Sequence, residues 1–254
     1  GNAADRDIIV DKLGLENSAA LSDGIYTAPV VADGCVYAVD GSGVAWCLDV
    51  DSLKVRWKFA SPGGPQNCNN VSSPAIAGNY LHFGTSAGWY YVLDRDTGAV
   101  VAEIDCAEPV FSTPVVGKER VYFATLGSQV YALQPDGDVV WKWDFVSEVI
   151  GFEGNRWSGA DWVKFRGDRV TWRDHFVCSR DICLIDRTVV IPAGGRTLFL
   201  EDEGTTARLR ATGEIPDVAG NEFPATFGQS ADDAGNVYVQ WHRRDNAGRV
   251  DILK

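Results

Sequence analysis

Ser112-Thr113-Pro114-Val115-Val116 repeats two earlier stretches of the chain, Thr27-Ala28-Pro29-Val30-Val31 and Ser73-Pro74-Ala75-Ile76. The three prolines are 45 and 40 residues apart. Each proline begins a short apolar strand, which is followed by a turn, a second strand, a turn with small residues, a third strand, an acidic turn and a last strand. The repetition therefore predicts a unit of four short antiparallel strands.

Such a unit cannot bury both faces of its sheet alone, but radial stacking of several units covers the faces. The sequence thus predicts an all-β fold, a β-propeller with four-stranded antiparallel blades. Less regular units continue at 182–200 and 225–253, and the 68 residues from Tyr122 to Val190 leave room for an irregular blade or an insertion at about 146–181. We expect six blades, with five to eight compatible, in a single domain over residues 1–254.

The ends of the chain predict how the ring closes. Residues 7–13 read as a strand that precedes the first complete unit, and the last unit stops after its third strand. The N-terminal strand is therefore expected to complete the last blade. The sequence holds no Met, even at position 1, which indicates that a leader or tag preceded it, and a removed signal would allow a membrane tether.

The composition excludes some partners. With 23 Lys and Arg against 35 Asp and Glu, the 254-residue chain has a formal charge of −12. Because nucleic-acid binding depends on basic residues, nucleic acid is not expected as a partner. No apolar run is long enough to span a membrane, which takes about 18 residues.

Six cysteines are available for pairing. Cys35 and Cys47 flank one turn at nearly equal distance and would face each other across a hairpin, Cys178 and Cys183 bracket a short segment, and Cys68 and Cys106 each precede a repeat. Disulfides would place the protein in an oxidising compartment. The alternative is six small buried thiols. Metal binding is not expected, because there is no Cys-x-x-Cys pair and the chain has three His.

The acidic turn and the strand after it carry a recognisable motif. Residues 47–57 resemble the tryptophan-docking motif of pyrroloquinoline-quinone (PQQ) propellers, Ala-x-Asp-x-x-Thr-Gly-Lys-x-x-Trp. The second copy has Ala102 where Trp is expected, and the third keeps Trp with one residue deleted. The matching residues are Asp49, Lys54, Trp57, Asp94, Gly98 and Trp141. The physical interpretation is that Asp and Gly shape the turn, while Trp packs between blades.

The resemblance implies one of two functions. Enzymes of this family are periplasmic alcohol and sugar dehydrogenases with eight blades, PQQ and Ca²⁺ on the axis, and often a vicinal disulfide. The other members resemble the outer-membrane assembly lipoprotein or bacterial sensor domains, and present loops to partners. This chain has no adjacent cysteines, no haem motif and a short length for eight blades, so the non-enzymatic group is expected.

Loops that gather on one face around the axis hold the first set of candidate partner-binding residues. This set comprises Asn67, Asn69, Asn70, Glu108 and Phe111. The alternative is that their polar groups only satisfy the backbones of turns.

Residues 151–175 gather basic and tryptophan side chains in an acidic chain. Trp beside Arg is enriched at binding hot spots, and guanidinium groups stack on indole rings. This pattern predicts a recognition loop, and the alternative is an irregular blade with a Trp-filled core. The candidates are Arg156, Trp157, Trp162, Arg173 and His175.

No pattern marks a catalytic site. Alternate carboxylates such as Asp94 and Asp96 could ligate Ca²⁺, but they lie where the fold needs tight turns. No spacing identifies a nucleophile with its base. We therefore expect a periplasmic or extracellular scaffold or sensor that binds protein, peptide or carbohydrate without a cofactor. The alternative is a PQQ- and calcium-dependent alcohol or sugar dehydrogenase.

Overall fold

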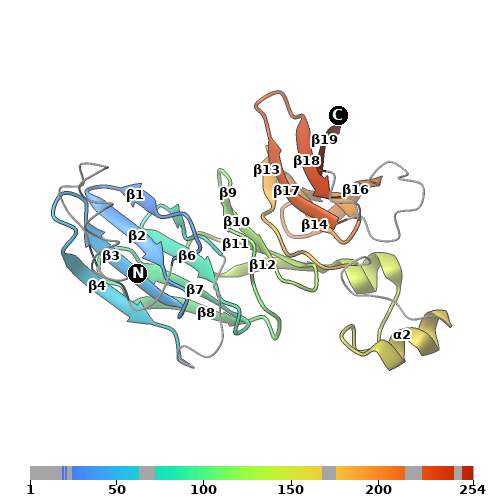
Figure 1. Ribbon diagram of the computed structural model, residues 1–254, viewed down its shortest axis with the longest axis horizontal. Coiled ribbons are helices and arrows are strands. Elements are labelled where there is room, and N and C mark those ends of the chain that lie inside the picture. Colours follow the sequence, from blue (N-terminus) through green and yellow to red (C-terminus); the bar gives the residue numbers. More distant parts are fainter. Residues whose placement is uncertain are drawn as a thin grey trace.

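Five antiparallel sheets follow one another along the chain (Figure 1). The structure is a computed structural model that describes residues 19, 21, 25–62, 72–167, 176–214, 225–242 and 248–253. Within each sheet every strand pairs with the next strand in sequence. This simple meander is what short strands joined by tight turns produce.

The first three sheets show the repeated unit most clearly. The first contains β1 (Val30–Ala32), β2 (Cys35–Val39), β3 (Val44–Asp49) and β4 (Val55–Ala60). The second contains β5 (Ala75–Ala77), β6 (Tyr80–Gly84), β7 (Trp89–Asp94) and β8 (Val100–Asp105). The third contains β9 (Val115–Val116), β10 (Val121–Ala124), β11 (Gln129–Leu133) and β12 (Val139–Asp144).

The rest of the described chain departs from this regularity. A π-helix η1 (Val146–Ile150) and an α-helix α2 (Gly159–Arg166) separate the third sheet from the fourth. The fourth sheet contains β13 (Cys183–Ile185), β14 (Thr188–Ala193), β15 (Arg196–Asp202) and β16 (Ala207–Glu214). The fifth contains β17 (Ala225–Ala231), β18 (Val237–His242) and β19 (Gly248–Leu253).

Acidic residues shape the turns between third and fourth strands. Asp49 Oδ1 accepts hydrogen bonds from the backbone N–H of Ser52 at 2.9 Å and from its hydroxyl at 2.8 Å. Asp94 bonds Thr97 in the same way, at 2.9 and 2.7 Å. The Thr97 hydroxyl and backbone bonds hold the pKa of Asp94 below its usual range. These carboxylates therefore serve the turns, in keeping with the preference of Asp for such positions.

Neighbouring sheets make close contact at the same turns. The Trp57 indole N–H donates to the Arg95 carbonyl at 2.8 Å, and a Cβ atom on Gly98 would lie only 2.7 Å from the Trp57 ring. Between the second and third sheets the smaller Ala102 takes the place of the indole, and a Cβ on Gly137 would lie 2.5 Å from it. Glycine at these two turns is therefore what lets the first sheet approach the second and the second approach the third.

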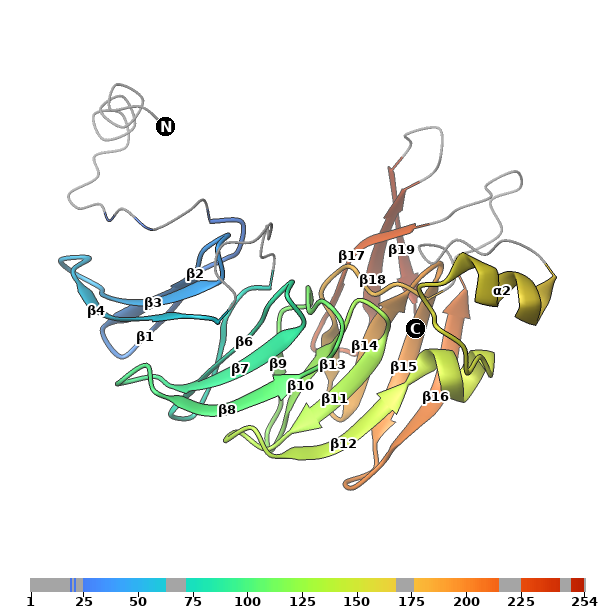
Figure 2. The same cartoon turned by 90° about the horizontal axis from the view of Figure 1, so that it is seen from below.

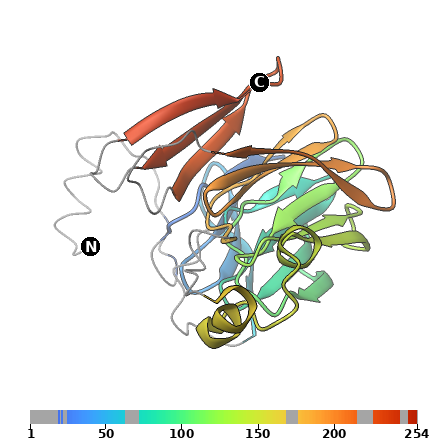
Figure 3. The ribbon, with the colours of Figure 1, turned by 90° about the vertical axis from the view of Figure 1, so that its right-hand side faces the viewer.

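The sheets are arranged along an arc, with the first sheet at one end and the fifth at the other (Figure 2). In Figure 3 the fifth sheet and the helices lie on opposite sides of the molecule. An all-β architecture with propeller-like four-stranded blades is thus confirmed. The described residues give five sheets where six were expected, because residues 146–166 form helices and connecting loop where a sixth blade was considered. The expected closing strand, residues 7–13, lies outside the described residues.

The predicted facing of Cys35 and Cys47 is wrong. The hairpin pairs Val39 with Ala45, and this register places Tyr37 opposite Cys47 and Asp49 opposite Cys35. All five described cysteines, Cys35, Cys47, Cys106, Cys178 and Cys183, are free thiols, and Cys68 lies outside the described residues. Cys35 and Cys47 lie diagonally on one face of the sheet with their thiols near each other, but a disulfide would require backbone movement because diagonal Cα atoms are generally too far apart.

Candidate functional site

The segment from Val146 to Gly167, here called the helical insertion, contains three of the predicted partner-binding residues. Arg156 and Trp157 lie in the loop between η1 and α2, and Trp162 lies on α2. The other described candidates, Glu108 and the half-buried Phe111, lie in the connection from β8 to β9. Asn67, Asn69, Asn70, Arg173 and His175 lie outside the described residues.

Glu108 is buried beside the turn between β10 and β11. Its Oε2 atom accepts hydrogen bonds from the Thr125 hydroxyl at 2.7 Å and from the Gly127 N–H at 3.1 Å. A Cβ on Gly127 would lie 2.3 Å from the same oxygen, so this turn needs glycine for the carboxylate to fit. The structure thus brings two predicted residues together, because Glu108 Oε1 also lies 3.2 Å from Arg156 Nε.

Arg156 fixes the helical insertion to the third sheet. Its guanidinium bonds both carboxylate oxygens of Asp144, at the end of β12, and donates to the Gly127 carbonyl at 2.7 Å. The side chain is 15% exposed, and Glu108 is 6% exposed. A buried pair with this many hydrogen bonds is costly to break, because either charge left alone would be desolvated. Glu108 and Arg156 therefore anchor the insertion.

Aromatic rings form a continuous stack through the insertion. Trp162 stacks on Phe152 with centroids 3.9 Å apart and on Phe176 at 5.7 Å. Trp157 meets Phe176 edge-on at 5.4 Å, and Phe165 meets Phe152 edge-on at 5.2 Å. The centre is buried, but Trp157 and Phe165 at the two ends are 40% and 45% exposed. Trp162 therefore fills a small core, whereas Trp157 is partly exposed to solvent.

Local sequence explains why α2 forms. The Ser158 side chain caps the helix by accepting from the Asp161 N–H at 3.2 Å, and Asp161 places a carboxylate in the first turn. Trp162 and Phe165, three residues apart, lie on one side of the helix and reach Phe152. The contributions of Phe152, Phe165 and Asp144 were missed from sequence, although the Ser-x-x-Asp spacing and the aromatic spacing were visible signals.

A hollow of about 440 Å³ lies beside the Phe165 end of the stack. We call it the aromatic pocket. Its lining residues are Gly151, Phe152, Glu153, Gly154, Asp161, Lys164 and Phe165. Lys164 Nζ lies 3.4 Å from Asp161 Oδ1, and the lysine side chain is 80% exposed. The pocket therefore combines two aromatic rings with a charged rim at the edge of the molecule.

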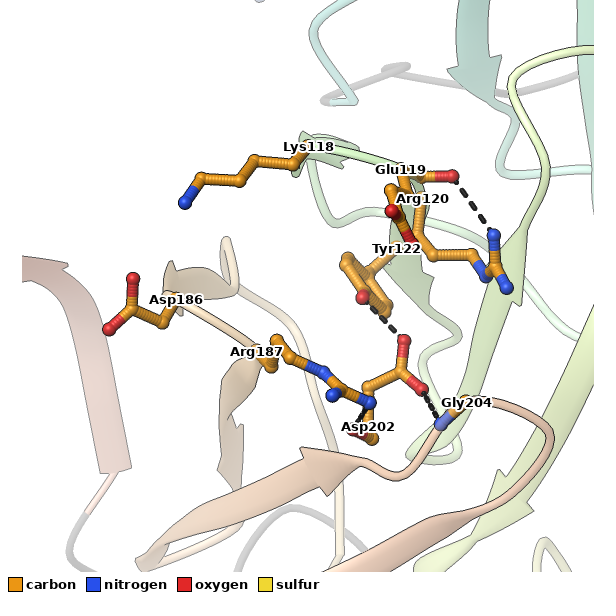
Figure 4. Close-up of a pocket in the computed structure, with 8 residues that line it drawn as sticks. All are labelled: Lys118, Glu119, Arg120, Tyr122, Asp186, Arg187, Asp202 and Gly204. Carbon is orange, nitrogen blue, oxygen red and sulfur yellow. Dashed lines mark hydrogen bonds between the residues drawn. The ribbon is translucent and has the colours of Figure 1, made fainter.

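A second hollow, of about 430 Å³, lies between the third and fourth sheets, beside the turn that joins β9 to β10 (Figure 4). Tyr122 donates to Asp202 Oδ2 at 2.6 Å, and Trp141 donates to Oδ1 at 3.1 Å. Burial, followed by the bond to Asp202, raises the pKa of Tyr122. Three basic side chains balance three acidic ones in the lining, and Arg187 also donates to the Asp202 backbone. These polar groups join the two sheets, so this hollow has a structural role.

Among the described residues no three His, Cys, Asp or Glu side chains lie together as a metal site would require. No helix in the described part of the chain has the length and apolar character to cross a bilayer.

Comparisons with known proteins agree with the repeat. The family model for the outer membrane protein assembly factor BamB matches residues 15–113 and 84–170. A curated relative, the outer membrane protein assembly factor BamB of Legionella pneumophila (strain Paris), is 24% identical over 101 residues, which is 40% of this chain and 25% of that protein. The chain thus spans about a quarter of this relative's length.

Solved structures share the fold at low identity. The quinohemoprotein alcohol dehydrogenase ADHIIG from Pseudomonas putida HK5 has a TM-score of 0.61 at 14% identity, covering 91% of this chain and 41% of the enzyme. The WD40 β-propeller domain of Doa1 has a TM-score of 0.52 at 12% identity, covering 89% of this chain and 62% of that domain. Because the family model covers more than half of the 254 residues, the chain belongs to the family of the outer membrane protein assembly factor BamB.

Proposed function

We propose that this protein is a non-catalytic propeller scaffold of the periplasm, which binds a protein partner through its helical insertion. Membership in the BamB family supports a role in assembly. The observation that carries the proposal is the aromatic stack whose two ends, Trp157 and Phe165, remain exposed. Exposed aromatic residues on a rigid base are the usual anchors of protein interfaces.

The insertion is built to keep its shape. The buried Glu108–Arg156–Asp144 network fixes it to the third sheet, so its exposed rings are held in place before a partner arrives. A preorganised surface loses less conformational entropy on binding. A protein partner is preferred over a carbohydrate because the exposed groups at the two ends are separate apolar anchors, which suits a broad contact.

In-cell photo-crosslinking tests this proposal. A photoreactive phenylalanine analogue replaces Phe165 or Trp157 in the native host, and Val31 on β1 serves as the control, since it is 62% exposed and lies on the first sheet. We expect one discrete protein adduct from positions 157 and 165 and none from position 31. Adducts from position 31 alone, or none at all, would contradict the proposal.

A second arm tests the absence of catalysis. The purified protein is mixed with PQQ and Ca²⁺, and its absorbance and its dye reduction with alcohols and sugars are recorded. We expect neither a bound chromophore nor turnover. Turnover would establish the dehydrogenase alternative and overturn the proposed scaffold.

A further inference from the structure

The aromatic pocket has two walls that meet nearly at a right angle. Phe152 and Phe165 are inclined by 73°, with ring centroids 5.2 Å apart. Phe152 is fixed by its stack on the buried Trp162, whereas Phe165 is 45% exposed. Phe165, the accessible ring, therefore offers a cationic side chain an aromatic face to lie against, and Phe152 provides a rigid second wall.

Two carboxylates stand at the rim of the same pocket. Asp161 is held in place by its Oδ2 atom, which accepts from the Asn155 N–H at 3.2 Å. Glu153 is exposed and makes no hydrogen bond or ion pair with the described residues. A cationic group of a partner would therefore find the available carboxylate of Glu153 beside the positioned carboxylate of Asp161.

Lys164 shows that a positive charge can lie against a carboxylate of this rim. Its ammonium group lies 3.4 Å from Asp161 Oδ1, while its side chain is 80% exposed. A surface pair between neighbours on one helix is weak, so an incoming cation can displace it at little cost. The formal charge of −12 on the chain adds a general attraction for basic partners.

We propose that the aromatic pocket receives an arginine or lysine side chain from a basic segment of the protein partner. This inference rests on the proposed function and names the chemistry that the partner presents there. The side chain lies against Phe165 and donates hydrogen bonds to the carboxylates of Glu153 and Asp161. Arginine is favoured over lysine, because a planar guanidinium can stack on the ring and bond a carboxylate at once.

Peptide titration followed by NMR tests the inference without the partner. The probe is acetyl-Gly-Arg-Gly-amide, and its control carries citrulline, which keeps the shape but not the charge. We expect saturable shifts of resonances from residues 151–165 with the arginine peptide only. Equal binding of the citrulline peptide would overturn the inference.

Matched variants separate the pocket from general charge attraction. Glu153→Gln and Phe165→Leu should each weaken arginine-peptide binding about two- to five-fold. Lys164→Gln should strengthen it about two-fold, since the internal competitor is gone. Glu148→Gln is the control, because Glu148 is exposed on η1 outside the pocket lining, and it should change nothing. Equal losses from Glu148→Gln and Glu153→Gln would contradict a specific site.

The two levels of the proposal fail separately. If crosslinks form at Phe165 but the arginine peptide does not bind, the scaffold function stands and the basic side chain is wrong. If neither crosslinks form nor the peptide binds, both are wrong.

Discussion

The Nε2 atom of His82 in the second sheet lies 2.9 Å from the carbonyl oxygen of Pro135 in the third. A carbonyl oxygen only accepts, so Nε2 carries the proton, and Nδ1 is left to accept from the Tyr90 hydroxyl at 3.2 Å. Tyr37 makes the equivalent bond to the Arg95 carbonyl of the second sheet at 3.3 Å. At two successive contacts between sheets, a side chain on the second strand of one sheet thus bonds the turn between the third and fourth strands of the next sheet.

His82 makes the stability of the fold dependent on pH. Burial lowers its pKa from 6.5 to about 4. In the unfolded chain His82 therefore binds a proton near pH 6.5, whereas in the folded chain it binds that proton only near pH 4. The free energy of unfolding should fall as the pH drops through this window, by up to about 3 kcal/mol.

Urea unfolding of the wild type and of His82→Gln at pH 7 and pH 4.5 measures this contribution. Glutamine can keep both hydrogen bonds but does not titrate. The variant should lose less stability between the two pH values than the wild type. The same loss in both proteins would show that His82 does not carry the effect.

The contact between Trp57 and Gly98 should be sensitive to a single methyl group. Gly98 has a φ of 73°, and an added Cβ would lie 2.7 Å from the Trp57 ring. Gly78 has a φ of 59° with nothing within 4 Å of the same position, so it provides the backbone control. Gly98→Ala should destabilise the protein by about 1–3 kcal/mol more than Gly78→Ala, as measured by urea unfolding. Equal effects would mean that the indole does not pack there.

Removing Glu108 should be costly, because its partner stays buried. Glu108→Ala leaves Asp144 as the charged partner of Arg156 in this network and leaves the Thr125 hydroxyl without its acceptor. We expect a loss of about 3 kcal/mol or more in the free energy of unfolding. Arg208→Gln, at a 58% exposed side chain that pairs with Glu203 and Glu201, should cost only about 1 kcal/mol. A similar small loss at both sites would argue against a buried anchor.

The described thiols should be slow to react in the folded protein. Burial, the largest cause, raises the pKa of Cys47 and of Cys178 to about 12. Since the thiolate is the nucleophile, both should resist iodoacetamide at pH 8 until the chain is unfolded. Peptide mass mapping of the labelled sites measures this, with urea-unfolded protein as the reference. Rapid labelling of Cys47 in the folded state would contradict the structure.

Sequence was most informative where short-range chemistry controls structure. The acidic turns at Asp49 and Asp94 follow from carboxylates that accept from backbone N–H groups three residues ahead, so the repeat was visible. The bond from His82 to Pro135 joins residues 53 positions apart and depends on how the sheets stack, which one sequence does not reveal.

The candidate site was only partly predictable. Trp157 and Trp162 stood out as aromatic residues near basic ones, and the structure places both in one stack with Phe176. The burial of Arg156 could not be foreseen, because its partners Glu108 and Asp144 lie in other parts of the chain, on the connection from β8 to β9 and at the end of β12. A loop residue that the sequence presents as a partner-binding candidate can thus instead fix its own loop to the rest of the fold.

Amide hydrogen exchange with the crosslinked partner, once identified and purified, tests the location of the binding surface most directly. Exchange is compared across the whole protein with and without that partner. We predict slowed exchange in residues 146–167 and unchanged exchange in the turns of the first sheet. Protection confined to the first sheet, or to the hollow between the third and fourth sheets, would contradict the assignment of the helical insertion as the binding surface.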